Sequence, residues 1–147
     1  MKYPLLVLLF GASMVLSATV VSAKEDRPYT DGPVTDFTYI RTKPGMFDEY
    51  MKWLATVAKQ LVDEEKKTGI VLDAKVYTVE PRRPSDPDVI LSITYPNMAV
   101  FDGLDDRLDA ITEKVEGSVK KANDAMIGRE KLREVLGSEL VREVVFK

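Results

Sequence analysis

Two apolar stripes at helical spacing restrict the fold of this chain more than any other feature. Apolar residues recur at every third or fourth position over 47–62 and again over 101–126. This spacing lines up side chains along one face of an α-helix. We expect a first helix that begins at Phe47 and ends at Gly69, and a long second helix that bends where Gly117 and Gly128 interrupt it.

The segments between the stripes are rich in β-branched and aromatic residues, and apolar and polar side chains alternate along them. The predicted strands are 34–42, 70–79, 89–95 and 139–146. A proline-rich loop, PRRPSDPD, joins the two central strands. We also expect a short helix over 129–136, with Gly137 as its stop before the last strand.

The order strand, helix, strand, strand, helix, strand predicts an α+β, ferredoxin-like βαββαβ fold. Right-handed crossovers place both helices on one face of a four-stranded antiparallel sheet and leave the other face open. The side chains expected on the open face are a mixture of polar and apolar residues: Val71, Asp73, Lys75, Tyr77, Val79, Ile90, Ser92 and Thr94. Such a mixture suits a sheet that closes against a second copy around a small cavity, so we predict dimerisation through the sheet.

The first 23 residues carry the features of a secretory signal peptide. A single basic residue, Lys2, precedes an apolar run over 5–16, and small residues lead to Ala23. The pattern predicts cleavage after Ala23 and a periplasmic or secreted mature chain. A membrane anchor is the alternative, but the apolar run is short for a hydrocarbon layer of about 30 Å. We therefore expect no membrane span after cleavage.

The rest of the chain divides into a flexible N-terminal arm over 24–33 and one domain over 34–147. After removal of the signal peptide, 20 basic residues face 24 acidic ones, for a formal net charge of −4. A mildly acidic surface argues against nucleic acid as a partner. The chain has no Cys, so an exported form would fold without disulfides, as suits the bacterial periplasm.

The absence of both His and Cys excludes several chemistries. A Ser-His-Asp triad, a cysteine nucleophile, a thiolate or imidazole zinc site and a histidine haem ligand are all ruled out. The acidic cluster over 102–106 is best interpreted as the start of a helix, where acidic residues are favoured, and not as a metal site. We predict no cofactor and no metal.

Several features of the chain resemble the dimeric α+β barrel superfamily. They are the strand that ends in Lys43-Pro44-Gly45, the helix that begins Met46-Phe47-Asp48-Glu49-Tyr50, the paired strands and the terminal strand. That superfamily includes antibiotic-biosynthesis monooxygenase-like, EthD-like and NIPSNAP-like proteins. The segment LGSELVREVVFK at 136–147 is more similar to uncharacterised secreted bacterial proteins than to any enzymatic branch of the superfamily. The resemblance implies a homodimer whose sheets face each other, sometimes around a pocket for an apolar substrate. Histidines that serve catalysis or haem binding in several branches have no counterpart here.

Four residues are candidates for ligand binding. Tyr39 and Tyr77 fall in predicted strands and would offer a ring and a hydroxyl to a planar ligand, although strand propensity alone also accounts for them. Trp53 lies off the main apolar stripe of the first helix, where it would contact the last strand or mark a dimer edge.

Arg142 alternates with apolar residues of the last strand, and a charge on such a face needs a partner. It is our first candidate for an anchor of an anionic or carboxylate group. A structural ion pair with Asp36, Asp73 or a helix carboxylate is the interpretation to which we give more weight, because structural ion pairs outnumber ligand sites.

Three functions fit these observations. The first is an exported homodimer that binds a small apolar or aromatic molecule, or acts as an accessory protein, without catalysis. The second is a cofactor-free monooxygenase or isomerase that acts on such a molecule, with Asp73, Tyr77 and Arg142 as catalytic residues and Asp73 as the base. The third is a monomeric module that docks on another protein through its open sheet. We favour the non-enzymatic homodimer.

Overall fold

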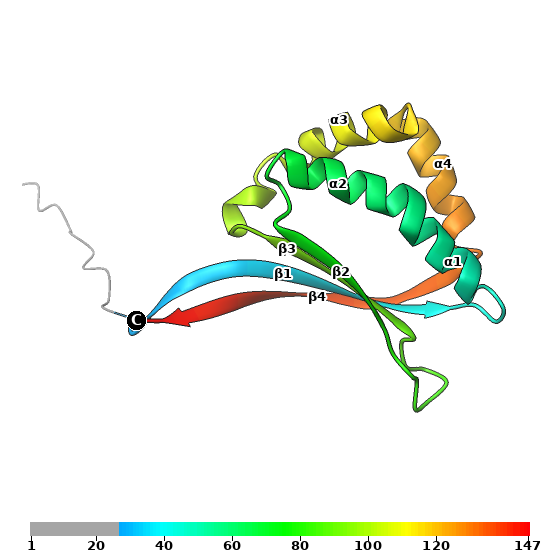
Figure 1. Cartoon of the computed structure of the whole chain (residues 1–147), viewed down its shortest axis with the longest axis horizontal. Helices are drawn as coiled ribbons and strands as arrows, with labels where there is room; N and C mark the ends of the chain where they lie inside the picture. Colours follow the sequence, from blue (N-terminus) through cyan, green and yellow to red (C-terminus); the bar gives the residue numbers. More distant parts are fainter. Residues whose placement is uncertain (1–26) are drawn as a thin grey trace, which may run out of the picture.

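The computed structural model describes residues 27–147 (Figure 1). The predicted signal peptide and the first residues of the arm lie outside this range. The elements in chain order are β1 (Tyr29–Thr42), α1 (Phe47–Trp53), the π-helix η1 (Leu54–Ala58), α2 (Lys59–Lys67), β2 (Asp73–Thr78), β3 (Val89–Tyr95), the 3₁₀-helix η2 (Met98–Phe101), α3 (Leu104–Glu116), α4 (Val119–Arg129) and β4 (Arg133–Phe146).

The four strands form one antiparallel sheet in the order β2-β3-β1-β4. All helices lie on the same side of it, and the opposite face is bare (Figure 1). This is the predicted ferredoxin-like α+β arrangement, and the prediction of four strands with helices on one face is confirmed. The chain puts β1 in the interior of the sheet, between β3 and β4, so both halves of the fold depend on it.

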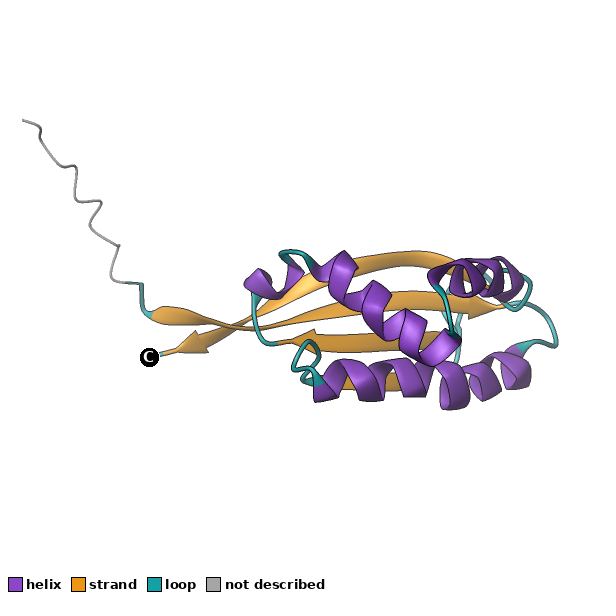
Figure 2. Cartoon of the chain, turned by 90° about the horizontal axis from the view of Figure 1, so that it is seen from above, coloured by secondary structure: helices purple, strands orange, loops and turns teal. Residues whose placement is uncertain are grey.

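The first predicted helix is one continuous rod made of α1, η1 and α2 (Figures 1 and 2). It begins at Phe47, as its apolar stripe predicts, with Asp48 and Glu49 favourably placed in the first turn. After the rod, Gly69 adopts the left-handed conformation with φ of 75°, which terminates the helical run. The π-helical turn at its centre widens the backbone directly after Trp53.

The core consists of two clusters between the helices and the sheet. The first joins α1 and η1 to β1 and β3, and the second joins the end of the rod to η2 and α3. The buried members of the first are Ile40, Tyr50, Leu54 and Val89, and those of the second are Ile70, Val71, Val100 and Ile111. Because both clusters lie on the helix side, the stability of the single chain comes from that side of the sheet.

Val71 departs from its predicted place on the open face. It is buried in the second cluster beside Ile70, whereas Leu72 is exposed. The reason is that β2 begins only at Asp73, so the residues before it follow a turn and do not alternate as a strand does.

The second predicted helix is divided into two helices and does not merely bend. Gly117 ends α3 in the left-handed conformation, with φ of 86°. Ser118 then caps α4, because its side chain accepts a hydrogen bond from the backbone nitrogen of Lys121 at 3.2 Å. Gly128, which we also expected to interrupt the helix, stays within α4.

The predicted short helix over 129–136 is wrong, because α4 ends at Arg129, residues 130–132 form a turn and β4 already begins at Arg133. Arg133 pairs with Thr42 of β1, and Gly137 is a strand residue that pairs with Tyr39. Between these positions the register shifts by one residue at Leu136, which forms a β-bulge. Pairing along the whole edge of β1 therefore overrides the local helical pattern.

The first strand is longer than predicted, because β1 begins at Tyr29 and takes in the second half of the predicted arm. Tyr29 pairs with Phe146 at the far end of β4. Figure 2 shows that this part of the β1–β4 pair continues as a two-stranded ribbon past the helices. The sequence TDGP over 30–33 reads as a turn, but it is held in a strand that contains a second register shift.

Replacement of Ser118 by Ala tests the break between α3 and α4. Loss of the cap leaves a backbone donor of α4 unpaired, so the variant should lose about 1 kcal/mol of unfolding free energy in urea titrations. Ser85→Ala, in an exposed loop where the structure shows no side-chain hydrogen bond, is the matched control. Equal stability of the two variants would show that Ser118 does not cap the helix.

Candidate functional site

The bare face of the sheet carries most of the predicted site residues. Ile40 and Val89 are register partners that point into the helix-side core, so their neighbours Tyr39 and Ile90 point the other way. The side chains that share this open face, from the edge strand β2 to β4, are Asp73, Lys75, Tyr77, Ile90, Ser92, Thr94, Thr35, Phe37, Tyr39, Glu139 and Val141.

Tyr39 and Tyr77 lie in one row across three strands. Both pair with Ile90, Tyr39 from β1 and Tyr77 from β2, so the two rings flank an apolar side chain. Two strand spacings of about 4.8 Å separate their backbones, with Ile90 on the strand between them. The structure thus brings together the two tyrosines that the sequence singled out, and their role in ligand binding stays a prediction.

The hydroxyl of Tyr39 donates a hydrogen bond to Glu139 on β4, at 2.5 Å. This bond, together with the nearby negative charge, raises the pKa of the Tyr39 phenol. The phenol therefore stays neutral, and its hydroxyl is occupied by the hydrogen bond to Glu139. Tyr77, on the edge strand, is 44% exposed.

Phe37 and Glu139 are open-face residues that the sequence analysis did not single out. They pair with each other, and Phe37 also pairs with Ser92, which is buried at the centre of the face. Phe37 stands two positions before Tyr39 in the same strand, a spacing that could have revealed its place on this face.

Arg142 lies on the opposite side of the sheet from the tyrosines. It pairs with Val34, whose face is that of Ile40, and its guanidinium donates to Asp31 at 2.9 Å. The ion-pair alternative is thus the one observed, but with Asp31 in place of Asp36 or Asp73. The partner was missed because Asp31 lies in the part of β1 that we assigned to the flexible arm.

Asp73 is on the open face, at the first residue of the edge strand β2. Its carboxylate contacts Lys75 at 3.1 Å and Lys66 at 3.2 Å. Hydrogen bonds from Lys75, and next from Lys66, lower the pKa of Asp73. A lowered pKa makes a weaker base, so this geometry does not favour Asp73 as the proton acceptor of an enzyme.

Trp53 is far from the open face, because α1 lies on the helix side. Its ring stacks on that of Tyr50, with centroids 5.9 Å apart, and the guanidinium of Arg129 lies 4.6 Å above it. The second contact that its position off the stripe indicates is thus the C-terminal end of α4. Trp53 and the two tyrosines of the sheet do not share a site.

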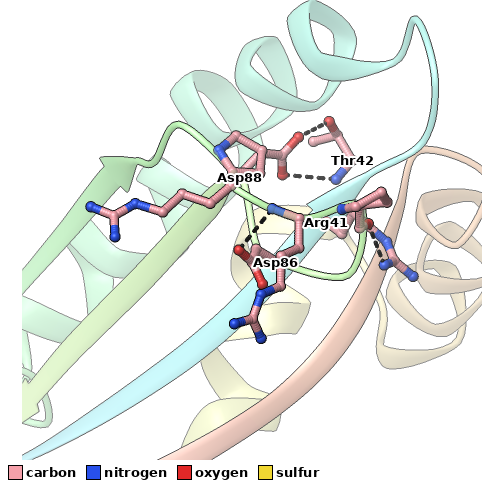
Figure 3. Close-up of a pocket in the computed structure, with 8 residues that line it drawn as sticks. Arg41, Thr42, Asp86 and Asp88 are labelled. Carbon is pink, nitrogen blue, oxygen red and sulfur yellow. Dashed lines mark hydrogen bonds between the residues drawn. The ribbon is translucent and has the colours of Figure 1, made fainter.

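A hollow of about 420 Å³ lies under the loop between β2 and β3 (Figure 3). It is lined by Arg41, Thr42, Pro81, Arg82, Arg83, Pro84, Asp86 and Asp88. Asp88 accepts hydrogen bonds from the backbone nitrogen and the hydroxyl of Thr42, and Asp86 accepts one from the backbone nitrogen of Arg83. The guanidinium of Arg41 donates hydrogen bonds to the carboxylate of Glu134 and to the backbone carbonyl of Pro84. These bonds anchor the proline-rich loop to β1.

No protein-family model matches the chain, and no curated protein sequence matches it significantly. Solved structures do resemble it. HapK from Hahella chejuensis has 15% identity and a TM-score of 0.51, over 75% of this chain and 91% of HapK. Protein SO0527 from Shewanella oneidensis has 12% identity and a TM-score of 0.50, over 80% of this chain and 96% of SO0527. A dimeric ferredoxin-like protein from an uncultured marine organism has 13% identity and a TM-score of 0.44, over 80% and 96%.

At these identities the likeness concerns the fold. Together with the sheet order and the placement of the helices, it defines this chain as a ferredoxin-like α+β domain. The predicted ferredoxin-like α+β fold class is confirmed. Within residues 27–147, none of the helices has the length and apolar character needed to cross a membrane.

The sequence analysis also missed three neighbouring groups with raised pKa values: Glu65 on α2, Asp36 on β1 and Tyr95 on β3. Burial raises the pKa of Glu65 and that of Asp36. Burial, and then the charges of Glu65 and Asp36, raise the pKa of Tyr95 to about 12. The run DEEKK over 63–67 reads as a solvated helix end, so nothing in the sequence marks Glu65 as buried.

Glu65→Gln should stabilise the protein at neutral pH. The folded-state pKa of Glu65 is raised, so its stabilising contribution is present below the ordinary value near 4.5 and is lost as the pH rises through the raised pKa. The variant should be more stable than the parent in urea at pH 7, and the difference should vanish toward pH 4.

Glu64→Gln is the matched control, because the neighbouring carboxylate has the opposite shift. Hydrogen bonds from Lys114, and next from Lys67, lower the pKa of Glu64. Its contribution is present above the ordinary pKa and is lost as the pH falls through the lowered one. This variant should be less stable than the parent at pH 7. Two variants that respond alike at pH 7 would refute the assignment of the buried and the paired carboxylate.

Proposed function

We propose that the chain acts as an exported homodimer that closes its open sheet face against a second copy and binds a small apolar or aromatic molecule between the sheets. The observation that carries this proposal is the row of Tyr77, Ile90 and Tyr39 on a face that no helix covers. A single chain leaves this row in water, whereas a second sheet would bury it.

The distribution of polar groups supports a cavity between the two sheets. The middle of the face carries Phe37, Tyr39 and Ile90 beside the polar Thr35, Ser92 and Thr94, while charged residues stand toward its edges: Asp73 and Lys75 on β2 and Glu139 on β4. A cavity of this composition would combine apolar surface with a few polar groups, which is the usual make-up of small-molecule sites. The phenol of Tyr77 would supply a hydrogen bond to the ligand, since that of Tyr39 is engaged by Glu139.

Binding without catalysis is the form of this proposal that the geometry supports. The three residues that an enzyme would use do not converge, because Arg142 is on the far side of the sheet and is paired with Asp31. Asp73 is held ionised by two lysines. Export is proposed from the amino-terminal leader alone.

Light scattering should give a mass of two chains for the protein without its leader. Val141→Lys should reduce that mass to one chain, because Val141 is 41% exposed on the open face and would place a charge in the interface. Val144→Lys, which is 45% exposed on the other face of the same strand, should remain dimeric. A one-chain mass for the parent would contradict the dimer and favour a module that docks on another protein.

Native mass spectrometry of protein purified from the periplasm of its own source should show a dimer with a retained small molecule. The chain mass should correspond to a first residue of Lys24. Tyr77→Ala should reduce the retained fraction several-fold, since a ring that stacks on a ligand contributes about 1 kcal/mol. Tyr29→Ala, at the tip of the ribbon, should retain the molecule as the parent does. Ligand-free parent protein would contradict the small-molecule role.

A further inference from the structure

One carboxylate on the face that no helix covers has no positive charge beside it (Figure 1). Glu139 of β4 accepts a hydrogen bond from the hydroxyl of Tyr39 at 2.5 Å, and this donor is neutral. Glu139 is exposed, and it takes part in none of the ion pairs formed within residues 27–147. Its charge is therefore accessible to a cation that approaches the open face.

Lys75 lies in the same row of the open face but does not neutralise Glu139. The row crosses the four strands as Lys75, Ser92, Phe37 and Glu139. Three strand spacings of about 4.8 Å thus separate the backbones of the two charged residues, and two other side chains stand between them. The ammonium group of Lys75 instead contacts Asp73 at 3.1 Å.

An open space adjoins Glu139 on the same face. Gly137 pairs with Tyr39, and a β-carbon at this glycine would have no atom within 4 Å. Glu139 stands two residues further along the strand, on the same face, and Phe37 is its partner on β1. The space therefore lies beside a carboxylate and two aromatic residues, which are the groups that bind an ammonium ion through charge and through the faces of rings.

We propose that Glu139, Tyr39 and Phe37 form the subsite for the ammonium group of a small organic amine. The apolar or aromatic body of the amine would lie along the neighbouring row, which Ile90 and Tyr77 complete. This inference rests on the proposed function, because it names the chemical class of the molecule that the open face binds.

Closure of a second sheet over the open face makes a cation necessary. The second sheet would remove water from Glu139, and a carboxylate that loses water without gaining a cation is costly to bury. The phenol of Tyr39 supplies a hydrogen bond but no charge. An ammonium group supplies both, since it neutralises the carboxylate and donates up to three hydrogen bonds. A neutral ligand would leave the carboxylate uncompensated, and an anionic one would be repelled.

Calorimetric titration of the protein without its leader tests the subsite with three ligands that share one ring. The ligands are phenethylamine, phenethyl alcohol and phenylacetate, which are cationic, neutral and anionic at neutral pH. The amine should bind saturably and at least about tenfold more tightly than the alcohol, because hydrogen bonds between charged groups are stronger than neutral ones. Phenylacetate should bind most weakly of the three.

Glu139→Gln removes the charge of the subsite and keeps an oxygen that can accept from Tyr39. This variant should bind phenethylamine about tenfold more weakly or worse, while its affinity for phenethyl alcohol changes little. Glu143→Gln is the matched control. Glu143 is exposed on the same face of β4, four residues further along, and its variant should bind both ligands as the parent does.

Gly137→Val separates a binding role from a structural one. Its side chain would occupy the open space and meet no neighbouring atom at the β-carbon, and valine is favoured in strands, so the fold should be retained. The affinity for phenethylamine should nevertheless fall several-fold. Absence of amine binding, equal affinities of the parent for amine and alcohol, or unchanged amine affinity in Glu139→Gln would each overturn the subsite. Equal affinities would leave the proposed cavity standing, whereas a one-chain mass for the parent would remove the cavity itself.

Discussion

The pairing of β1 with both β3 and β4 is the interaction on which the rest of this structure depends. β1 pairs with β4 along most of its length and with β3 over residues 34–40, and its Val34 and Ile40 are among the most completely buried side chains. The strand joins two halves of the chain that have little other contact across the sheet. Because successive residues of a strand face opposite ways, β1 also decides which side chains meet the helices and which meet the bare face.

Local patterns predicted the first helix and a central strand of the sheet. The stripe that begins at Phe47 predicts the first helix, and the alternation over Val89–Tyr95 gives that strand with its exact bounds. Long-range pairing decided the parts that failed. The residues of β4 before Gly137 have a helical pattern, and those of β1 before Val34 have a turn-like composition, yet each segment is held extended by the other strand. A single sequence gives no sign of such pairing between its two ends.

The candidate site residues could likewise be predicted where a local pattern places them, and could not where long-range pairing does. Tyr77 could be placed on the open face from strand alternation, whereas the impure alternation of the first strand left the face of Tyr39 undecided until its pairing with Ile90 was seen. Arg142 could not be assigned a partner, because Asp31 became one only through the unexpected extension of β1. The contact of Trp53 with Arg129 could not be predicted for a different reason. Trp53 lies in a helix that we could predict, but Arg129 ends α4 just before a junction with β4 that we could not predict.

The ribbon formed by the two ends of the chain also has a consequence for how the domain assembles. The backbone nitrogen of Lys147 donates to the carbonyl of Pro28 at 3.0 Å, so the first and last described segments close on each other. The edge of β1 that faces β4 stays unpaired until the C-terminal strand has joined it, and pairing between segments so far apart in the sequence is of the kind that slows folding. The domain therefore cannot reach its final shape before both ends of the described chain have met.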